Sequence, residues 1–491
     1  MNEKLASVVP LGSVQSVSDQ VDQERIKNSF DYLRLSFCDL NGLHLSKLIS
    51  TQNLGKLLKN SCEIYSGVFT FGPRNEIVNI PEIVEKRHAN GFMKPDWSTL
   101  HSLPWAGSLP DHVSVPAKRI GSVLCEIHWI EGPVIDTMPR HVAKLMLNRL
   151  MERHKLKVYS AFEPEFRVFT PESVVDACLN RINPTDTSTL PAPFTLGTDM
   201  YKTDLLSIYE RFFLTLDHYL RSLGINIQDF CTENGEGQLE TPVMPLYGLQ
   251  SADVYFILKQ AIKEIAPQCG LFASFMPKPL ANMCSSGCHY NHSLWRVDDN
   301  KNAFYDANAE NRLSETARHW LGGLLEHLPA ILALCSPTVN CYRRLHRHLA
   351  PSLVNWDLDD RFTSIRVKNV DESRTYIENR LASSAGGPYH VLAVTLAAGM
   401  DGLERKLEPP PRGIKDPEIA KKLPESLPDA LECLRNDHHL VNILGARFVD
   451  WFIQVKERGD LATMPNAKEM MKEEETVETL AKERYEYFKY T

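Results

Sequence analysis

Apolar and polar residues follow two regular patterns along this chain. Alternation over residues 158–169 (VYSAFEPEFRVF) predicts a β-strand, because successive side chains of a strand point to opposite faces. Two more strands are expected between Tyr32 and Ile49, on either side of Asn41-Gly42, since Asn-Gly supplies the positive φ of a tight hairpin turn. Apolar residues three to four positions apart predict helices at 53–61, from Pro139 onward, and at 204–223, 251–267, 313–334, 389–405 and 427–457.

The order of these elements divides the chain into an arm and two domains. Residues 1–25 are polar and irregular and are expected to form a mobile arm. Strand and loop patterns in 26–138 predict a small β-rich domain, and long helices mixed with strands in 139–491 predict a larger one, so the expected fold class is α+β. The last segment, 467–491, has helical spacing; it either docks on the body or on a neighbour, or forms a solvated charged helix.

Composition narrows the class of protein. The content of 43% hydrophobic and 24% charged residues is typical of a globular chain. No apolar run approaches the roughly 18 residues of a membrane span, and the first residues lack a secretory signal pattern. Eleven cysteines without a C-x-x-C pair fit reduced thiols, and a net charge of −8 argues against nucleic-acid binding. We therefore expect a cytoplasmic protein with no nucleic-acid or membrane partner.

Pairs of glutamates are the first candidate chemistry. Glu163 and Glu165 share one face of the expected strand at 158–169, and two carboxylates that close repel each other unless a cation lies beside them. Taken alone, this pattern is more often an exposed strand edge with two solvated glutamates. A second acidic segment, TENGEGQLETP at 232–242, carries Glu233 and Glu240, which could converge on the same cation.

Imidazoles, thiols and arginines follow these acids. His289, Asn291 and His292 come after a loop of small residues. With Cys284 and Cys288 the two histidines could instead bind zinc, although their spacing is tighter than the separated pairs of a structural zinc site. Arginines recur in NCYRRL at 340–345, DDRFTSIRV at 359–367 and ENR at 378–380, and their planar donor fork suits phosphate and carboxylate oxygens.

In order and spacing, these elements resemble the glutamine synthetase family over about residues 30–460. The matching segments are D-L-N-G at 39–42, L-P-W at 103–105, E-P-E-F at 163–166, E-x(4)-Q-x-E at 233–240, F-M-P-K-P, S-G-x-H and S-L-W within 275–295, N-x-Y-x-R-L at 340–345, and I-E-N-R, G-P-Y and A-A-G-M-D-G within 377–402. Among family members, the sequences of the segments NCYRRL, DDR and ENRL are most similar to those of the lengsin branch. The resemblance implies a small β-grasp domain and a catalytic domain whose curved antiparallel sheet forms a half-barrel backed by helices.

The resemblance also implies roles for individual residues. It assigns one divalent ion to Glu165, Glu233 and Glu240 and another to Glu163, His289 and Glu378, with Mg²⁺ or Mn²⁺ suited to such oxygen-rich ligands. The remaining implied roles are phosphoryl stabilisation by Arg361 and Arg366, binding of the glutamate carboxylate by Arg344 with Arg380 in the same charge cluster, and nucleotide contact by Ser293 and Asn291. Asn291 stands at a position where a second histidine is common.

Several positions depart from the family pattern around the glutamate, the amine and the nucleotide. The loop over the glutamate, usually Asn-Gly-Ser-Gly, is Cys284-Ser285-Ser286-Gly287 here, so we expect glutamate to bind differently. The segment LHRHLAP at 345–351 lacks the glutamate that takes a proton from ammonium. Residues 60–95 contain no aspartate, so the small domain's usual Phe-Asp-Gly-Ser segment is absent, and Tyr376 replaces a nucleotide-side arginine. Ordinary glutamine synthesis from ammonia is therefore in doubt.

Two functions follow from the resemblance. The first is an ATP- and Mg²⁺- or Mn²⁺-dependent carboxylate–amine ligase, with glutamate or a related carboxylate, an amine and a nucleotide as small-molecule partners. The second is a catalytically inactive, lengsin-like structural or chaperone-like protein, which would allow a cytoskeletal partner. Both imply a homo-oligomer, a ring or a double ring of twelve subunits, in which the small domain of one subunit closes the site of the next.

Overall fold

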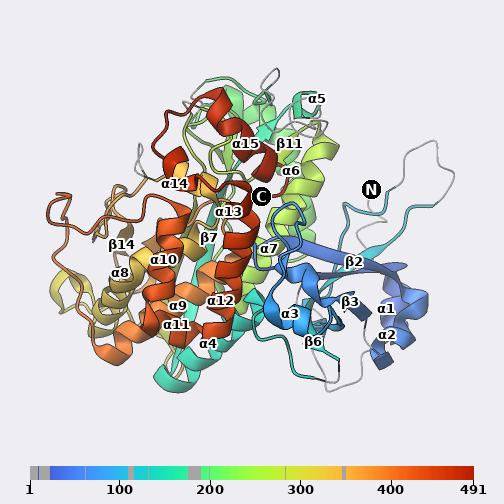
Figure 1. The fold of residues 1–491 in the computed structure, drawn as a ribbon, viewed down its shortest axis with the longest axis horizontal. Helices are drawn as coiled ribbons and strands as arrows, with labels where there is room; N and C mark the ends of the chain where they lie inside the picture. Colours follow the sequence, from blue (N-terminus) through green and yellow to red (C-terminus); the bar gives the residue numbers. More distant parts are fainter. Residues whose placement is uncertain are drawn as a thin grey trace.

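The computed structural model describes residues 9, 11, 23–60, 62–108, 116–130, 132–174, 190–197, 200–281, 283–345 and 350–491 (Figure 1). Strands and helices from residue 23 to 130 form one side of the molecule, and the elements from residue 139 onward form the larger remainder. The expected α+β class is confirmed. Most of the expected arm at 1–25 lies outside the described residues, and helix α1 (Gln23–Ser29) already begins within it.

The smaller part is built on a sheet with the strand order β2-β1-β6-β4-β3, to which β5 adds by pairing with β6. The bounds are β1 Tyr32–Cys38, β2 His44–Ser50, β3 Cys62–Tyr65, β4 Asn90–Pro95, β5 His101–Ser102 and β6 Ile120–Trp129. Antiparallel pairing of β1 with β2 confirms the expected hairpin. At its turn, one carboxylate oxygen of Asp39 accepts from the backbone N–H groups of Asn41 and Leu43, at 2.9 and 2.7 Å.

The hairpin turn lies against the larger part of the molecule. Gly42 has a φ of +82°, and a Cβ added to it would lie 2.8 Å from the Cα of Gly387, directly before helix α9. The Lys456 ammonium group also donates to the side-chain oxygen of Asn41 at 2.7 Å. Glycine at position 42 therefore meets two demands, a left-handed backbone and close contact with another backbone.

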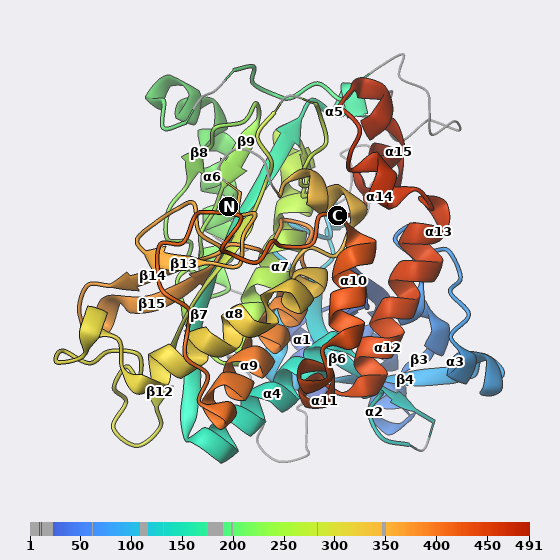
Figure 2. The same cartoon turned by 60° about the vertical axis from the view of Figure 1, so that its left-hand side comes forward.

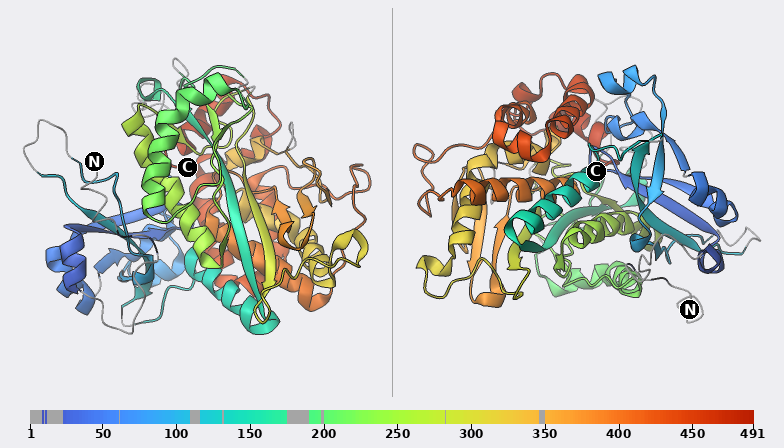
Figure 3. Two further views of the ribbon diagram at one scale, coloured as in Figure 1. Left: turned by 180° about the vertical axis from the view of Figure 1, so that it is seen from behind. Right: turned by 90° about the horizontal axis from the view of Figure 1, so that it is seen from below.

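The larger sheet follows the order β13-β14-β15-β12-β7-β9-β8 and curls into a half-barrel, with β10 and β11 also pairing with β7. Its bounds are β7 Leu156–Phe169, β8 Cys231–Thr232, β9 Gln238–Glu240, β10 Leu246–Tyr247, β11 Phe272–Ser274, β12 Cys288–Arg296, β13 Trp356–Leu358, β14 Ile365–Asn369 and β15 Thr375–Asn379. β7 and β12 run side by side as its long central strands (Figure 3). Every pair is antiparallel except β13 with β14.

Helices pack against the sheets and against each other (Figure 2). Their bounds, after α1, are α2 Leu54–Asn60, α3 Pro81–Glu85, α4 Pro139–His154, α5 Pro171–Val174, α6 Thr203–Ser222, α7 Leu249–Ile265, α8 Glu315–Cys335, α9 Pro388–Arg405, α10 Leu427–Asn436, α11 His438–Leu444, α12 Ala446–Val455, α13 Leu461–Thr463, α14 Ala467–Met470 and α15 Val477–Tyr487. α8 and α9 approach closely at Gly399, where the Trp320 ring of α8 fills the space that a Cβ would need. No described helix is long and apolar enough to cross a membrane.

One expected helix, 427–457, is wrong as a single element. The structure divides it into α10, α11 and α12. Asp437 leaves the helical conformation and caps α11 by accepting from the N–H of Leu440, and Gly445, with a φ of +102°, separates α11 from α12. Aspartate commonly starts helices and glycine commonly ends them, and these two residues break the segment. The helical spacing of apolar residues nevertheless continues across both breaks, which is why it predicted one helix.

The C-terminal segment docks on the body. Glu483 of α15 is fully buried and accepts from the Nε and Nη2 of Arg343, both at 3.0 Å. Tyr487 and Phe488 are buried in the core, and the Tyr487 hydroxyl donates to Asp460 at 2.8 Å. Of the two alternatives for 467–491, docking is therefore right and a solvated helix is wrong.

Candidate functional site

Neighbouring strands of the larger sheet bring the predicted acids together. The register pairs Glu163 of β7 with His289 of β12, and Glu165 of β7 with Glu240 of β9. Glu378 lies on β15, the next strand beyond β12. Side chains directly opposite each other on paired strands point to the same face, so residues far apart in the chain gather on one side of the half-barrel.

The first group consists of Glu163, His289 and Glu378, whose ligand atoms all lie within 4.8 Å of one another. The Nδ1 of His289 is 3.5 Å from an oxygen of Glu163 and 3.5 Å from one of Glu378. Burial, followed by the nearby Arg380 charge, lowers the pKa of His289 to about 3, so its imidazole is neutral at neutral pH. Burial raises the pKa of Glu163, although a hydrogen bond from Asn291 at 2.7 Å opposes the shift.

The second group consists of Cys231, Glu233 and Glu240, also within 4.8 Å of one another. Burial, followed by the charges of Glu165, Glu163 and Glu233, raises the pKa of Glu240 to about 9. Burial removes the water that would stabilise this carboxylate, and the neighbouring acids repel its charge, so a divalent cation bound here would favour the ionised form. Sequence reasoning missed Cys231, which faces Glu240 across the β8–β9 pair.

Glu165 belongs to neither group. One of its oxygens accepts from the Nε2 of Gln238 and from the backbone N–H of Gly287, both at 2.8 Å. Glu165 was expected to form a trio with Glu233 and Glu240. The structure places it opposite Glu240 on the paired strands, but the group that gathers with Glu233 and Glu240 contains Cys231 instead.

Arginines surround the first group. Arg366 donates to Glu378 at 2.9 Å, and its Nε donates to Asp359 at 3.0 Å. Arg380 also pairs with Glu378. Two arginines therefore already contact Glu378. Asp359, which the sequence did not single out, shares Arg366 with it.

Arg344 is buried with a free donor. Its Nη2 donates to the backbone oxygen of Arg380 at 3.1 Å and lies 3.5 Å from the Nε2 of His289, whereas its Nη1 has no hydrogen-bond partner within the described residues. A Cβ at Gly287 would lie 2.8 Å from that Nη2, so glycine makes room for the guanidinium. A buried guanidinium donor without an acceptor fits a site for an anionic ligand.

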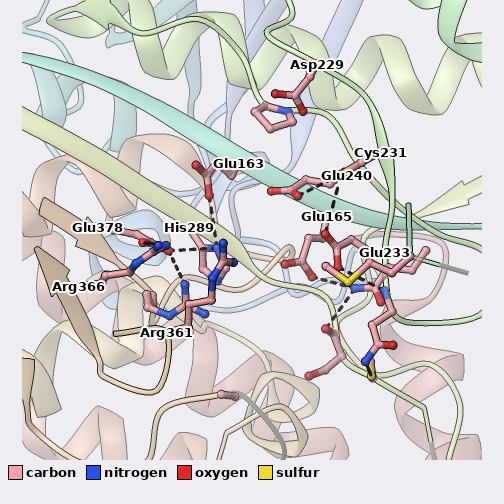
Figure 4. Close-up of a pocket in the computed structure, with 18 of the residues that line it drawn as sticks. Glu163, Glu165, Asp229, Cys231, Glu233, Glu240, His289, Arg361, Arg366 and Glu378 are labelled. Carbon is pink, nitrogen blue, oxygen red and sulfur yellow. Dashed lines mark hydrogen bonds and ion pairs between the residues drawn. The ribbon is translucent and has the colours of Figure 1, made fainter. Parts of the chain in front are cut away.

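A single pocket of about 1050 Å³ joins the two groups (Figure 4). It is lined by ten of the residues singled out from the sequence: Glu163, Glu165, Glu233, Glu240, His289, Arg344, Arg361, Arg366, Glu378 and Arg380. In the close-up, Arg361 and Arg366 lie with the first group, and Cys231 with the second. Asp229 and Tyr201 are lining residues that the sequence did not identify, because only the fold brings their loops to the sheet.

Two expected nucleotide contacts lie outside this lining. Asn291 lies beside the pocket and donates a hydrogen bond to Glu163, and the Ser293 hydroxyl accepts from the Nε1 of Trp295 at 2.9 Å.

The zinc alternative is wrong. Alternation along β12 turns Cys288 and His292 away from His289, and His292 accepts from the Nε1 of Trp320 in the core at 3.0 Å.

The donor sets fit divalent cations. Carboxylates with one neutral imidazole suit Mg²⁺ or Mn²⁺ in the first group, and the second group offers two carboxylates and a thiol. The arginines beside them supply the fixed positive charge that phosphate oxygens need. The half-barrel sheet, the two acid groups and the arginines beside them are the features by which the chain can be compared with known protein families.

The chain belongs to the glutamine synthetase family. The model of the glutamine synthetase catalytic domain matches residues 136–475. Among curated relatives, lengsin of Rattus norvegicus is 29% identical over 463 residues, covering 91% of this chain and 76% of its own length. Glutamine synthetase of Methanococcus voltae is 30% identical over 455 residues, covering 88% of this chain and 93% of its own length.

Solved structures agree with this assignment. A GmaS/ADP complex superposes with a TM-score of 0.74 at 26% identity, covering 89% of this chain and 94% of the other. GmaS without ligand gives the same TM-score and identity. The family is one of ligases that normally use ATP and divalent metals, bind small-molecule substrates and form oligomers.

Proposed function

We propose that this protein is an ATP- and Mg²⁺- or Mn²⁺-dependent ligase that joins the side-chain carboxylate of glutamate, or a related carboxylate, to an amine. The observation that carries this proposal is the convergence of two acid groups and four arginines on one pocket. Crowded carboxylates are stabilised by cations, and the arginines around them are stabilised by anionic groups. The pocket therefore fits a nucleotide phosphate bound through metal ions.

Each half of the pocket has a chemical task under this proposal. Glu163, His289 and Glu378 would hold one ion. The second ion would lie between Glu233 and Glu240, with Glu165 beside it. Bound ions would neutralise and orient the phosphate oxygens, as they do in other phosphoryl transfers.

The arginines would then handle the two substrates. Arg361 and Arg366 would contact the oxygens of the transferred phosphoryl group. The unpaired Nη1 of Arg344 would donate to the α-carboxylate of the amino-acid substrate, with Arg380 at its side. An oxygen of the other carboxylate attacks the γ-phosphorus and ADP leaves, which gives an acyl phosphate. The amine then attacks the acyl carbon, phosphate leaves, and the amine gives up one proton.

The acceptor amine is the open part of this proposal. Where the family carries a glutamate that takes the ammonium proton, residues 346–349 lie outside the described residues and contain no acid. Ammonia is therefore one member of a panel that should include primary alkyl amines and diamines. We also propose a cytoplasmic location, which the ten described free cysteines support.

The test is nucleotide binding followed by turnover. Purified protein with Mg²⁺ or Mn²⁺ should bind an ATP analogue, and with glutamate and one amine of the panel it should release phosphate. Glu163→Gln should abolish metal-dependent nucleotide binding, whereas Glu152→Gln, an exposed change of the same kind on α4, should not. Nucleotide binding equal in both variants would contradict the proposed site.

A non-catalytic, lengsin-like role is the second candidate, and Asp359 is the observation in its favour. This carboxylate forms an ion pair with Arg366, an arginine that the proposed reaction needs. Lys368 also pairs with Asp359. Under this alternative the protein folds and assembles normally, shows no metal-dependent nucleotide binding, and releases no phosphate with any amine. Binding without turnover would indicate a scaffold that responds to nucleotide.

For either function we propose a ring-shaped homo-oligomer, and a double ring of twelve subunits as its form. Family membership supports assembly, and the small sheet of one subunit would complete the pocket of its neighbour. Light scattering should give a mass several times that of the 55.7 kDa chain. A stable monomer with full nucleotide affinity would contradict the shared site.

A further inference from the structure

Arg344 follows directly on a short turn that the C-terminal helix holds in place. The turn is the 3₁₀ segment Val339–Arg343, and Arg344 itself lines the pocket. Glu483 of α15 is fully buried, and one of its oxygens accepts from the Nε and Nη2 of Arg343, both at 3.0 Å. Its other oxygen accepts from the Nδ2 of Asn340 at 2.7 Å. One carboxylate therefore binds two side chains of the turn that leads into Arg344.

The geometry of a 3₁₀ turn explains how these contacts direct Arg344. With three residues per turn, Asn340 and Arg343 project from the same side, and each successive side chain is rotated by about 120°. Arg344 comes one residue later, so its side chain leaves toward a different side, which is that of the pocket. Holding Asn340 and Arg343 against α15 therefore fixes the direction in which Arg344 projects.

Asn340 connects the same carboxylate to a second wall of the pocket. Its Oδ1 accepts from the backbone N–H of Lys278 at 2.8 Å, and its Nδ2 donates to the backbone oxygen of Lys278 at 2.9 Å. A primary amide has two N–H donors, and Asn340 gives one to Lys278 and the other to Glu483. Further along the chain from Lys278, Cys284 lines the pocket. Glu483 is therefore linked, through one amide side chain, to the segment that leads to Cys284.

α15 also contacts this segment, residues 278–287, directly. The Nη1 of Arg484 donates to the backbone oxygen of Pro279 at 3.2 Å. At the far end of the segment, a Cβ added to Gly287 would lie 2.8 Å from the Nη2 of Arg344. The 3₁₀ turn and the segment thus meet at Arg344, and both are fastened to α15.

We propose that Glu483 is a positioning residue for the carboxylate of the amino-acid substrate. It acts through Arg343 and Asn340 and sets the direction of the Arg344 guanidinium. Arg344 makes the contact with the substrate, and Glu483 makes none. This inference deepens the proposed function and rests on it, because it takes Arg344 as the group that binds the carboxylate.

Glu483→Gln tests this role with almost no change in size. A glutamine has one acceptor oxygen and one donor amide, so its amide has to face the donors of Arg343 or of Asn340. We expect the Kd for glutamate, measured by calorimetry with and without Mg²⁺ and an ATP analogue, to rise by roughly ten- to a hundredfold, because a displacement of about 1 Å can cost about 10²-fold. An unchanged Kd for glutamate would overturn the inference.

Two controls belong to this measurement. The Kd for the ATP analogue should stay close to its wild-type value in Glu483→Gln, because the metal groups lie on strands of the half-barrel and not on this turn. Glu478→Gln, an exposed change of the same kind on α15, should leave the Kd for glutamate unchanged. A loss of affinity for nucleotide as large as that for glutamate would indicate a general structural role and would overturn the inference.

A double-mutant cycle shows whether the effect passes through Arg344. Arg344→Lys should weaken glutamate binding by itself. Adding Glu483→Gln to Arg344→Lys should then weaken it little further, whereas two independent effects would multiply. In a protein that turns over, Glu483→Gln should raise the KM for glutamate more than it lowers kcat. Multiplying effects in the cycle would overturn the inference.

Arg343→Lys covers the case in which Glu483→Gln does not fold. Lysine keeps the positive charge opposite Glu483 but gives up the two-pronged contact. It should weaken glutamate binding in the same direction by a smaller factor, and wild-type affinity in this variant would overturn the inference. A wild-type protein that binds no glutamate would overturn it as well.

The proposed function fails separately. Glutamate binding that depends on Glu483, without phosphate release with any amine, would leave the positioning role standing and remove the ligase.

Discussion

The two halves of the pocket are built in different ways. The first group lies on the paired strands β7, β12 and β15, whose register fixes each side chain opposite the next. The second group depends on the two-residue strand β8, the turn after it and the three-residue strand β9. The extended ladder holds the set of residues expected from the family, and the short strands carry the unexpected thiol. Long paired strands leave little freedom for the identity and position of their side chains to change, whereas a turn between short strands leaves much more.

The largest effect should come from the strand-built half. Glu378→Gln removes the carboxylate that contacts His289, Arg366 and Arg380, and both arginines then lose a partner in a largely buried site. Loss of one member of a buried ion pair costs about 3–5 kcal/mol. We expect a lower free energy of unfolding in urea and no metal-dependent nucleotide binding by calorimetry. Unchanged binding would show that β15 contributes nothing to the metal site.

Gly287→Ala should have the next largest effect, at the junction of the two halves. The added Cβ would lie 2.8 Å from the Nη2 of Arg344, so the guanidinium has to shift. Overpacking of this kind costs about 1–3 kcal/mol in stability. If the enzyme turns over, the KM for the carboxylate substrate should rise more than kcat falls. Gly55→Ala on α2, where an added Cβ would meet only the side-chain oxygen of Gln23 at 3.7 Å, is the control that should leave this KM unchanged.

A smaller effect is expected from Asp359→Asn. The carboxylate is mostly exposed, so its pairs with Arg366 and Lys368 contribute no more than about 1 kcal/mol to stability. Removing the charge leaves Arg366 freer to meet a phosphate, and nucleotide affinity should increase, most clearly at low ionic strength. Affinity that falls, or that does not respond to salt, would show that Asp359 does not compete with the nucleotide.

The smallest effect is expected far from the pocket and serves as a reference for both halves. His327 of α8 lies between Asp401 and Asp437, at 2.8 and 2.6 Å, with Arg405 and His439 also beside Asp401. These two carboxylates hold the pKa of His327 above its usual value of 6.5, against the effect of burial. The ionised imidazole therefore adds stability that is fully present below pH 6.5 and is lost as pH rises through the folded-state pKa.

Thermal unfolding at several pH values measures this contribution. His327→Gln should flatten the decrease in stability above pH 6.5 while leaving metal and nucleotide binding unchanged. An equally steep decrease in the variant would assign the pH dependence to other groups.

Much of the strand-built half could be predicted from the sequence. Alternation placed Glu163 and Glu165 on one face, and segment order linked them to His289 and Glu378 through a family resemblance. Alternation does not give register, however, so the hydrogen bonds that separate Glu165 from the second group needed the structure. The contact of Asp359 with Arg366 was hidden for the same reason, since it depends on how a loop folds back on β14.

The loop-built half was less legible. Cys231 precedes Glu233 by two residues, and only the pairing of β8 with β9 shows that its sulfur lies between two carboxylates. The break of 427–457 into three helices is a different kind of miss. Asp437 and Gly445 are residues that cap and end helices, so the signal was present and the apolar spacing outweighed it.

Contact between Gly42 and Gly387 links the smaller sheet to the segment that follows the pocket residue Arg380. Two backbones touch there without side chains to slide or compress, and the glycine in α9's cap follows Arg380 by seven residues. Swinging the smaller sheet outward would have to pull these backbones apart and break the Lys456 bond to Asn41. The hairpin turn of the smaller sheet is therefore held directly against the start of α9, and displacing that sheet would disturb the segment that leads back to Arg380.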